Sequence, residues 1–251
     1  MAAFTGQTTS VTRRVTIKQL IAGLLFALCS VSGSAQENVR GILVAANKAT
    51  LSSELAARVV ALPKKMGQTF NKGDSLIRLD CRLFEAQLKK VDAEATVAQV
   101  KFDNTKQLNQ LNSIGTLDVA IAQADLQKVQ AERTIARLNV ERCDIKAPFD
   151  GAVEQLDIHT FEVVQQHQPL MKVVGRKHLE AEIIVPAKWV TLLVKNKAIT
   201  LQVEETEQSL EALVSYIGPS VDPASQTVQI RASIKKVPAK VLPGMSVLAV
   251  F

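Results

Sequence analysis

Two cysteines are the residues in this sequence best placed to react with each other. Cys81 and Cys143 each border a long segment that contains neither proline nor glycine. If both segments are helical and antiparallel, the cysteines meet at the base of the pair. A disulfide requires Cα atoms about 4.4–6.8 Å apart, which this register allows. Two buried free thiols are the alternative, and no cluster of further ligands nearby suggests a metal site.

The other chemically versatile residues are scattered along the chain. The histidines lack the spacing of a metal motif and the methionines stand alone, at positions His159, His167, His178, Met66, Met171 and Met245. We interpret Asp74 and Asp80 as turn and helix-start residues. Neither a glycine-rich phosphate loop nor a nucleophile elbow is present. The sequence therefore predicts neither an enzyme nor a cofactor.

The segments between the cysteines have the periodicity of two helices. Apolar or small residues alternate at spacings of four and three, at Phe84, Leu88, Val91, Ala95, Ala98, Phe102 and Thr105. This is a heptad stripe. Ser113 to Thr116 interrupts the pattern, and a second stretch runs from Leu117 to Arg142. We expect an antiparallel helical hairpin over 81–143.

The second helix of this hairpin carries two apolar stripes. One stripe is Leu117, Ile121, Ala124, Ala131, Ile135 and Leu138, and Lys128 is the one charged residue at a position of this stripe. The other is Val119, Ala122, Leu126, Val129, Ala136 and Val140. One partner helix needs a single stripe, so one of these faces the first helix and the other faces a neighbouring protomer. A loose pattern with one functional face is the alternative.

The segments on either side of the hairpin have the alternation of β-strands and repeat each other. Strands are predicted at 42–44, 57–62, 75–79, 152–156, 169–174, 180–185, 200–203, 227–232 and 246–251. The two flanks match at a constant offset of 94 residues, which pairs Val59 with Val153 and Leu76 with Leu170. Two strand-turn-strand units that cannot bury an apolar face alone would pair into one small sandwich.

The first 35 residues have the composition of a signal peptide. Arg13, Arg14 and Lys18 form a basic region, and the apolar stretch from Leu20 to Val31 is short for a membrane span. Residues 33–35 are small and predict a cleavage site after Ala35. An uncleaved membrane anchor is the alternative. Lipidation at Cys29 is disfavoured because a large leucine precedes it.

Export changes how the charge and the cysteines are interpreted. The formal net charge is +6, and three of these charges belong to the basic region, which leaves +3 on the mature chain. That mild charge, without basic runs interleaved with aromatics, does not predict a nucleic-acid partner. An oxidising compartment favours the disulfide between Cys81 and Cys143.

GQTFNKGDSLIRLD at 67–80 and IKAPFDGAV at 145–153 resemble the two halves of a biotinyl/lipoyl domain. In carriers of that fold a tight turn joins the halves and bears the modified lysine. Here the predicted hairpin replaces that turn. This arrangement is similar to that of the membrane fusion proteins, the periplasmic adaptors of the HlyD-like kind. AKWVTLL at 187–193, GPSVDPASQTVQIRASI at 218–234 and LPGM at 242–245 resemble the β-barrel of that family.

The resemblance implies a mixed α and β, elongated fold, a split lipoyl β-sandwich interrupted by a coiled-coil hairpin and followed by a small β-barrel. The implied segments are a signal peptide (1–35), an N-terminal strand that joins the barrel (36–46), the lipoyl halves (47–80 and 144–174), the hairpin (81–143) and the barrel (175–251). We expect a short form without a membrane-proximal domain. The family's glycines near Phe161 and His167 are missing, so we expect those turns to be made differently. Gln226 stands where the barrel usually has arginine.

The hairpin tip is the surface where the resemblance implies a partner. Drug-efflux adaptors contact an outer-membrane channel through an Arg, a Leu and a Ser at set spacing. Leu108 matches the Leu, but Asn104 and Gly115 replace the other two. Exposed apolar residues at an apex need a partner. The predicted contacts are Leu108, Leu111, Ile114, Gly115, Thr116, Leu117 and Asp118, although Leu111 and Leu117 alternatively just close the tip.

The sequence thus predicts a periplasmic adaptor at the inner membrane that links a pump to a TolC-like channel for small-molecule efflux. The resemblance implies a homo-oligomer of six protomers and favours a pump of the resistance-nodulation-division (RND) type over an ABC pump. An adaptor for ABC-driven type I protein secretion and a periplasmic scaffold unrelated to export are the alternatives.

Overall fold

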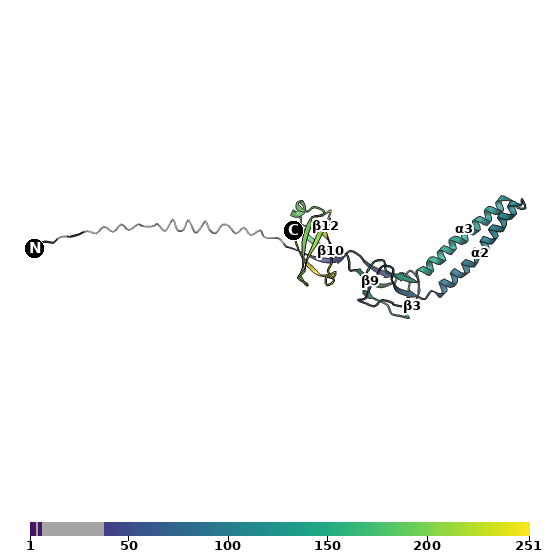
Figure 1. The fold of residues 1–251 in the computed structure, drawn as a ribbon, viewed down its shortest axis with the longest axis horizontal. Helices are drawn as coiled ribbons and strands as arrows, with labels where there is room; N and C mark the ends of the chain where they lie inside the picture. The colour runs from purple at the N-terminus through teal and green to yellow at the C-terminus, as the bar shows by residue number, and fades with distance from the viewer. Residues whose placement is uncertain (4, 7–37) are drawn as a thin grey trace. The chain divides into compact units, whose positions relative to one another are not determined.

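A computed structural model describes residues 1–3, 5–6 and 38–251 of the chain. Nearly all of the predicted signal peptide, including Cys29, lies outside the described residues. Two long helices, α2 (Arg82–Gln110) and α3 (Thr116–Glu141), run side by side in opposite directions (Figure 1). The predicted hairpin is therefore present. Thr116, which we expected in the turn, is the first residue of α3 because extended Gly115 caps the helix.

Eight strands form a sandwich at the base of the hairpin. They are β2 (Lys48–Ser52), β3 (Ala57–Ala61), β4 (Thr69–Phe70), β5 (Ser75–Leu79), β6 (Asp144–Lys146), β7 (Gly151–Leu156), β8 (Val163–Val164) and β9 (Pro169–Gly175). One sheet has the order β2-β9-β7-β4 and the other the order β6-β5-β3-β8. Each sheet therefore contains strands from both sides of the hairpin, and neither flank forms a sheet alone.

The repeat found in the sequence is also a repeat of strands and hydrogen bonds. Adding 94 to the bounds of β4 gives those of β8, and β3 and β5 shift in the same way onto the starts of β7 and β9. The Gly67 N–H donates to the Val153 carbonyl at 2.9 Å, and the Phe161 N–H donates to the Val59 carbonyl at 2.8 Å. In the same way, the Gly73 N–H donates to the Ala147 carbonyl, and the His167 N–H, 94 residues later, donates to the Ser53 carbonyl. The sandwich thus has an internal two-fold pattern.

The expectation that the turns at Phe161 and His167 are made differently is wrong. Phe161 has φ 72° and His167 has φ 65°, while their repeat partners Gly67 and Gly73 have φ 80° and 88°. The second half keeps the left-handed backbone although it lacks the glycines. Besides the main-chain hydrogen bonds to the first half, side chains close both turns locally: the Glu162 carboxylate accepts from the His159 N–H at 2.9 Å, and the Gln168 side-chain oxygen accepts from the Gln165 N–H at 2.9 Å. Main-chain and side-chain hydrogen bonds together hold the left-handed conformation at Phe161 and His167.

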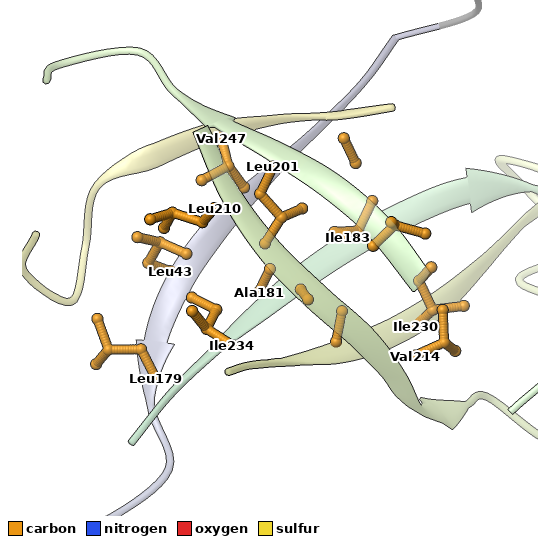
Figure 2. Close-up of a cluster of buried hydrophobic side chains, with 14 of the residues drawn as sticks. Leu43, Leu179, Ala181, Ile183, Leu201, Leu210, Val214, Ile230, Ile234 and Val247 are labelled. Carbon is orange, nitrogen blue, oxygen red and sulfur yellow. The ribbon is translucent and has the colours of Figure 1, made fainter. Parts of the chain in front are cut away.

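Six strands close into a barrel with the order β1-β10-β13-β12-β11-β14. They are β1 (Val39–Ala45), β10 (Leu179–Pro186), β11 (Ala198–Val203), β12 (Ser209–Ile217), β13 (Thr227–Ile234) and β14 (Ser246–Val250), with a 3₁₀ helix η1 (Ala187–Leu192) between β10 and β11. Alternate aliphatic side chains point inward and fill the barrel (Figure 2). β1 precedes the sandwich in sequence but pairs with β10 and β14.

The predicted fold class is confirmed: a β-sandwich interrupted by an α-helical hairpin and accompanied by a β-barrel. Five strands were missed by the sequence analysis, namely β2, β4, β6, β8 and β12. Two cores are present, one inside the barrel and one between the two sheets of the sandwich. Both are built from aliphatic residues for the most part, as expected for a chain in which aromatics make up 4%.

Candidate docking surfaces of the hairpin

The seam between α2 and α3 uses one apolar stripe from each helix. Val91 from α2 and Ala122, Leu126 and Ala136 from α3 are buried there. Of the two stripes predicted on the second helix, the one that includes Leu126 therefore faces α2. Small alanines in this seam allow the helices to approach closely. The hairpin is thus a two-helix coiled coil with a narrow core.

Ion pairs across the seam match the register of the two helices. The Arg133 Nε lies 2.6 Å from an Asp92 carboxylate oxygen, and the Lys101 Nζ lies 3.0 Å from an oxygen of Asp125. All four side chains are exposed, and such pairs contribute roughly 0.2–1 kcal/mol each. Their role is to favour one alignment of α2 on α3 over a slipped one.

The tip is closed by polar side chains, which leaves the apolar ones free. The Asn109 side-chain amide donates to the Ile114 carbonyl at 2.9 Å, and the Gly115 N–H donates to an Asp118 carboxylate oxygen at 3.2 Å. Asn112 adopts φ 54° between the helices. Asp118, predicted as a channel contact, therefore also caps α3, where a carboxylate is favoured by the helix dipole.

The structure brings the seven predicted tip residues together around one turn. Leu111 is 73% exposed and Leu117 is 70% exposed, so neither closes the tip by burial. Leu108 is at the edge of exposure and Ile114 is half-buried. Two large leucines at the end of a narrow hairpin form an apolar cap that a single copy of the chain leaves in water.

Both helices also carry an apolar row on their outer surfaces, which we call the outer rows. The row on α3 is the predicted stripe that begins at Leu117, and its members Ile121, Ile135 and Leu138 are exposed. The row on α2 was missed by the sequence analysis. It contains Leu83, Ala86, Ala93, Val97 and Val100, all exposed. Its signal was an alternation of three and four residues that Lys90 interrupts, with members one or two positions before those of the buried stripe.

A disulfide closes the base of the hairpin. Cys81 and Cys143 are bonded, with their Cα atoms 5.7 Å apart and a sequence separation of 62 residues. The cysteines are therefore not free thiols. Just beside them, Arg142 Nε lies 2.8 Å from Glu54, which connects the end of α3 to the sandwich. The helices are thus tied to the sheets by a covalent bond and a surface ion pair.

A second charged pair begins α2. The Arg82 guanidinium donates to both Asp80 carboxylate oxygens, the shortest contact being 2.6 Å, and the Arg82 N–H also donates to Asp80. These hydrogen bonds stabilise the carboxylate and lower the pKa of Asp80 to about 2. The helix-start role predicted for Asp80 agrees with this geometry.

The remaining candidates do not converge on a site. Met171 is fully buried in the sandwich, Met66 is exposed, and Met245 packs against the barrel core. His159 lies 3.6 Å from Glu162 within a single turn. Among the described residues no group of three or more His, Cys, Asp or Glu side chains could hold a metal ion. The hairpin surfaces are therefore the strongest candidates for function.

Comparison with solved structures defines the class of fold. A chimera of MacA and MexA, which contains the α-hairpin domain of Pseudomonas aeruginosa MexA, is 21% identical with a TM-score of 0.72, covering 84% of this chain and 79% of the chimera. The membrane fusion protein Spr0693 of Streptococcus pneumoniae R6 is 13% identical with a TM-score of 0.65, covering 84% and 96%. The chain has the fold of the membrane fusion proteins, the periplasmic adaptors.

At the level of sequence, the chain is similar to the nodulation protein NolF of Rhizobium meliloti strain 1021. The two are 24% identical over 205 residues, which covers 76% of this chain and 56% of NolF. The chain thus spans little more than half the length of this curated relative. No family model matches the sequence. None of the helices in the described residues is long and apolar enough to cross a membrane.

Proposed function

We propose that the chain is a periplasmic adaptor of a tripartite export system, bridging an inner-membrane pump to an outer-membrane channel. The observation that carries the proposal is the hairpin: a disulfide-anchored coiled coil with an apolar tip at one end and apolar outer rows along its sides. Such surfaces belong to a protein that works in an assembly. The proposed role is mechanical, and no catalytic step is assigned to the chain.

The outer rows support self-association into a ring. The α3 row of one protomer would lie against the α2 row of the next, as a and d positions do in a coiled coil. Because each protomer has one row of each kind on different helices, the contact is head-to-tail and repeats until the ring closes. By the family resemblance, six protomers complete the ring. Stacked hairpins, sandwiches and barrels would then surround a continuous conduit.

The tip is the proposed docking surface for a TolC-like channel. Leu111 and Leu117 would be buried on contact, and Thr116 lies directly beside them at the start of α3. In a ring, six such tips would present a circle of apolar side chains to the channel. Gly115 and Asp118 would form the narrow edge of this surface.

A photo-crosslinking experiment in cells tests the tip. A photoreactive amino acid replaces Thr116, and in a matched variant it replaces Thr96, an exposed threonine on α2 away from the tip. Captured proteins are identified by mass spectrometry. We expect an outer-membrane channel to be captured from Thr116 and not from Thr96. If the exported protein is abundant and neither Thr116 nor Leu111 captures a channel, the bridging role is wrong. The chain is then assigned instead to the alternative, a periplasmic scaffold that does not contact a channel.

The pump proposed as partner is of the RND type, and the proposed cargo is a small molecule. This choice follows from the predicted cleaved signal peptide, which in the resembling family accompanies proton-driven pumps more than ABC pumps. Purification of the adaptor with its inner-membrane partner distinguishes them. Recovery of an ATP-binding-cassette protein would instead assign the adaptor to ABC-driven secretion.

A further inference from the structure

The outer row of α3 reads the same in both directions along the helix. Its residue types run Leu, Ile, Ala, Lys, Ala, Ile, Leu, at Leu117, Ile121, Ala124, Lys128, Ala131, Ile135 and Leu138. All of these side chains are exposed. The row on α2, from Leu83 to Val100, has no such symmetry. The α3 row is therefore able to pack, layer on layer, against an identical row that runs the opposite way.

A two-fold axis beside Lys128 would match two such rows along the whole of α3. The helix spans Thr116–Glu141, so its middle falls beside Lys128, the centre of the row. Two copies related by this axis overlap from end to end, and Leu117 of one copy lies opposite Leu138 of the other. A two-fold contact uses the same patch on both copies and therefore requires a self-complementary patch. The α3 row meets that requirement in its residue types.

The charges at the centre of the row are also complementary between antiparallel copies. Among the residues that the structure describes, Lys128 and Glu132 form no ion pair, and both are exposed. In an antiparallel pair, Glu132 of one copy lies about one turn to the N-terminal side of Lys128 of the other. Helical side chains lean toward the N-terminus of their own helix, so these two lean toward each other, while the two lysines lean apart. The two-fold axis makes two such ion pairs.

A neighbour in the ring does not offer Lys128 the same charge match. Neighbouring hairpins of a ring stand at equal height, and the ion pair between Arg133 and Asp92 shows which residues of α3 and α2 lie level. On that scale Lys128 lies level with Val97 of the neighbour. Its side chain leans toward the tip and so points to the neighbour's α2 at Lys101, which has the same charge. The charges of the α3 row therefore fit a second α3 better than they fit α2.

The base of the hairpin has room for the tip of a second copy. Leu138, near the end of α3, borders a hollow of about 460 Å³ together with residues of β2 and β6. In the two-fold arrangement Leu117 of the second copy lies opposite Leu138, so the tip of that copy reaches this hollow. The surface is thus recessed at the place where a flat or protruding sandwich would prevent the two helices from overlapping fully.

We propose that unassembled copies of the chain pair through their α3 rows as an antiparallel, two-fold dimer. Leu117 belongs to the tip surface proposed for the channel, and in the dimer Leu138 of the second copy covers it. The dimer also occupies the row that a ring neighbour needs, so it must open before a ring forms. Pairing thus shields apolar side chains that a single copy leaves in water. The inference goes beyond the proposed function, because it concerns the protein before it meets a pump or a channel.

Single-cysteine crosslinking distinguishes the dimer from the ring. The protein recovered from the periplasm is treated with a short bis-maleimide, which does not react with the disulfide. A residue beside a two-fold axis meets its own copy, so Lys128→Cys alone should crosslink into a dimer and into nothing larger. Gln130→Cys is the matched control and should stay monomeric, because two residues turn a helix by about 200° and place this exposed position on the far side of α3. Lys128→Cys combined with Val97→Cys reports the ring, in which successive crosslinks give a ladder of larger products.

Charge reversal tests the ion pairs, with self-association measured by sedimentation velocity. Lys128→Glu should weaken the dimer about tenfold, because two attractive pairs become repulsive. Glu132→Lys should weaken it by a similar factor, and the variant with both changes should recover the wild-type affinity to within about twofold, because the pairs are then restored with their signs exchanged. Lys106→Glu, at an exposed lysine of α2 away from the α3 row, is the control and should leave self-association unchanged.

Two results would overturn the proposal. One is the absence of a dimer from Lys128→Cys while the variant that also carries Val97→Cys gives a ladder, which would reserve the α3 row for the ring. The other is unchanged or tighter self-association of Lys128→Glu, and tighter association is the result expected if residue 128 faces Lys101 of a ring neighbour. Neither result affects the capture of a channel from Thr116, so the dimer and the bridging role are judged separately.

Discussion

Replacing Phe161 by glycine should stabilise the sandwich. Phe161 is forced into a left-handed backbone with φ 72°, and its side chain is 73% exposed, so the substitution removes almost no packing. Its repeat partner Gly67 has the same backbone, and a Cβ atom built there would meet nothing within 4 Å. The cost at Phe161 is therefore conformational and does not come from a steric clash with neighbours.

The expected gain is the difference between two backbone terms. A non-glycine residue in the left-handed region costs about 1–2 kcal/mol. Glycine offsets part of this stabilisation, because the larger entropy of the unfolded chain lowers the free energy of unfolding by about 0.4–1 kcal/mol. Phe161→Gly should thus raise the free energy of unfolding by about 0.5–1 kcal/mol. His167→Gly should give a smaller gain, because histidine is one of the residues that tolerate positive φ.

Amide hydrogen exchange is the appropriate assay. Trp189 is in the barrel connection, so its fluorescence does not report unfolding of the sandwich. The N–H groups of Val59 and Val153 donate to the two repeated turns, at 2.8 Å to Glu162 and 3.0 Å to Gln68. Slower exchange at both amides would measure the gain for the whole sandwich.

Phe161→Ala is the variant that decides the cause. It removes the exposed ring but keeps the Cβ atom and hence the backbone cost, so it should leave exchange nearly unchanged. Equal stabilisation by Phe161→Ala and Phe161→Gly would refute the backbone argument and attribute the gain to loss of an exposed aromatic ring. The reverse change, Gly67→Ala, should destabilise by about 1 kcal/mol.

Three further predictions concern the hairpin. Replacing Cys81 and its disulfide partner by alanine should lower the free energy of unfolding by up to about 4 kcal/mol, measured in urea, since a 62-residue loop is released. Hydrogen bonds from Arg82 lower the pKa of Asp80 to about 2. The carboxylate of Asp80 therefore stabilises the fold above the unfolded pKa of 3.8, and this stabilisation is lost as pH falls toward 2. In Arg82→Ala, NMR titration should show a higher pKa for Asp80. Leu126→Ala, in the seam, should destabilise the hairpin by about 2–4 kcal/mol, whereas exposed Ile135→Ala should leave the thermal stability of the isolated protomer unchanged and weaken self-association measured by ultracentrifugation.

The hairpin was predictable because its signal is repeated many times. Seven positions from Phe84 to Thr105 share one spacing, and Gly115 marks the break. What the sequence did not reveal was the direction of each stripe, since an exposed heptad row and a buried one have the same period. Contacts between α2 and α3 settle that choice for a single protomer. The α2 row with Val97 and Val100 went unnoticed for the same reason.

The strands that the sequence analysis missed were missed for different reasons. β4 and β8 have two residues each, which is below the length at which alternation is visible. β12 does alternate, with Leu210, Ala212 and Val214 inside the barrel, but a register shift after Val214 interrupts the pattern. The turn at Phe161 was misjudged because its conformation is set by a main-chain hydrogen bond to Val59 in a distant strand and by the Glu162 side chain, which accepts from the His159 N–H. The preferences of Phe161 itself contain neither contact.

The order of the strands along the chain also predicts the order in which the hairpin, the sandwich and the barrel fold. The hairpin is enclosed by the sandwich in sequence, and the sandwich is enclosed by the barrel, because β1 ends at Ala45 and β10 begins at Leu179. Helix pairing needs one short turn, whereas each outer layer must close a longer loop and forms more slowly. We therefore expect assembly from the inside outward: the coiled coil brings β5 beside β6, the completed sandwich brings β1 beside β10, and the barrel forms last. Pulsed hydrogen exchange during refolding should then find protection at Leu126 before Val153, and at Val153 before Ile183.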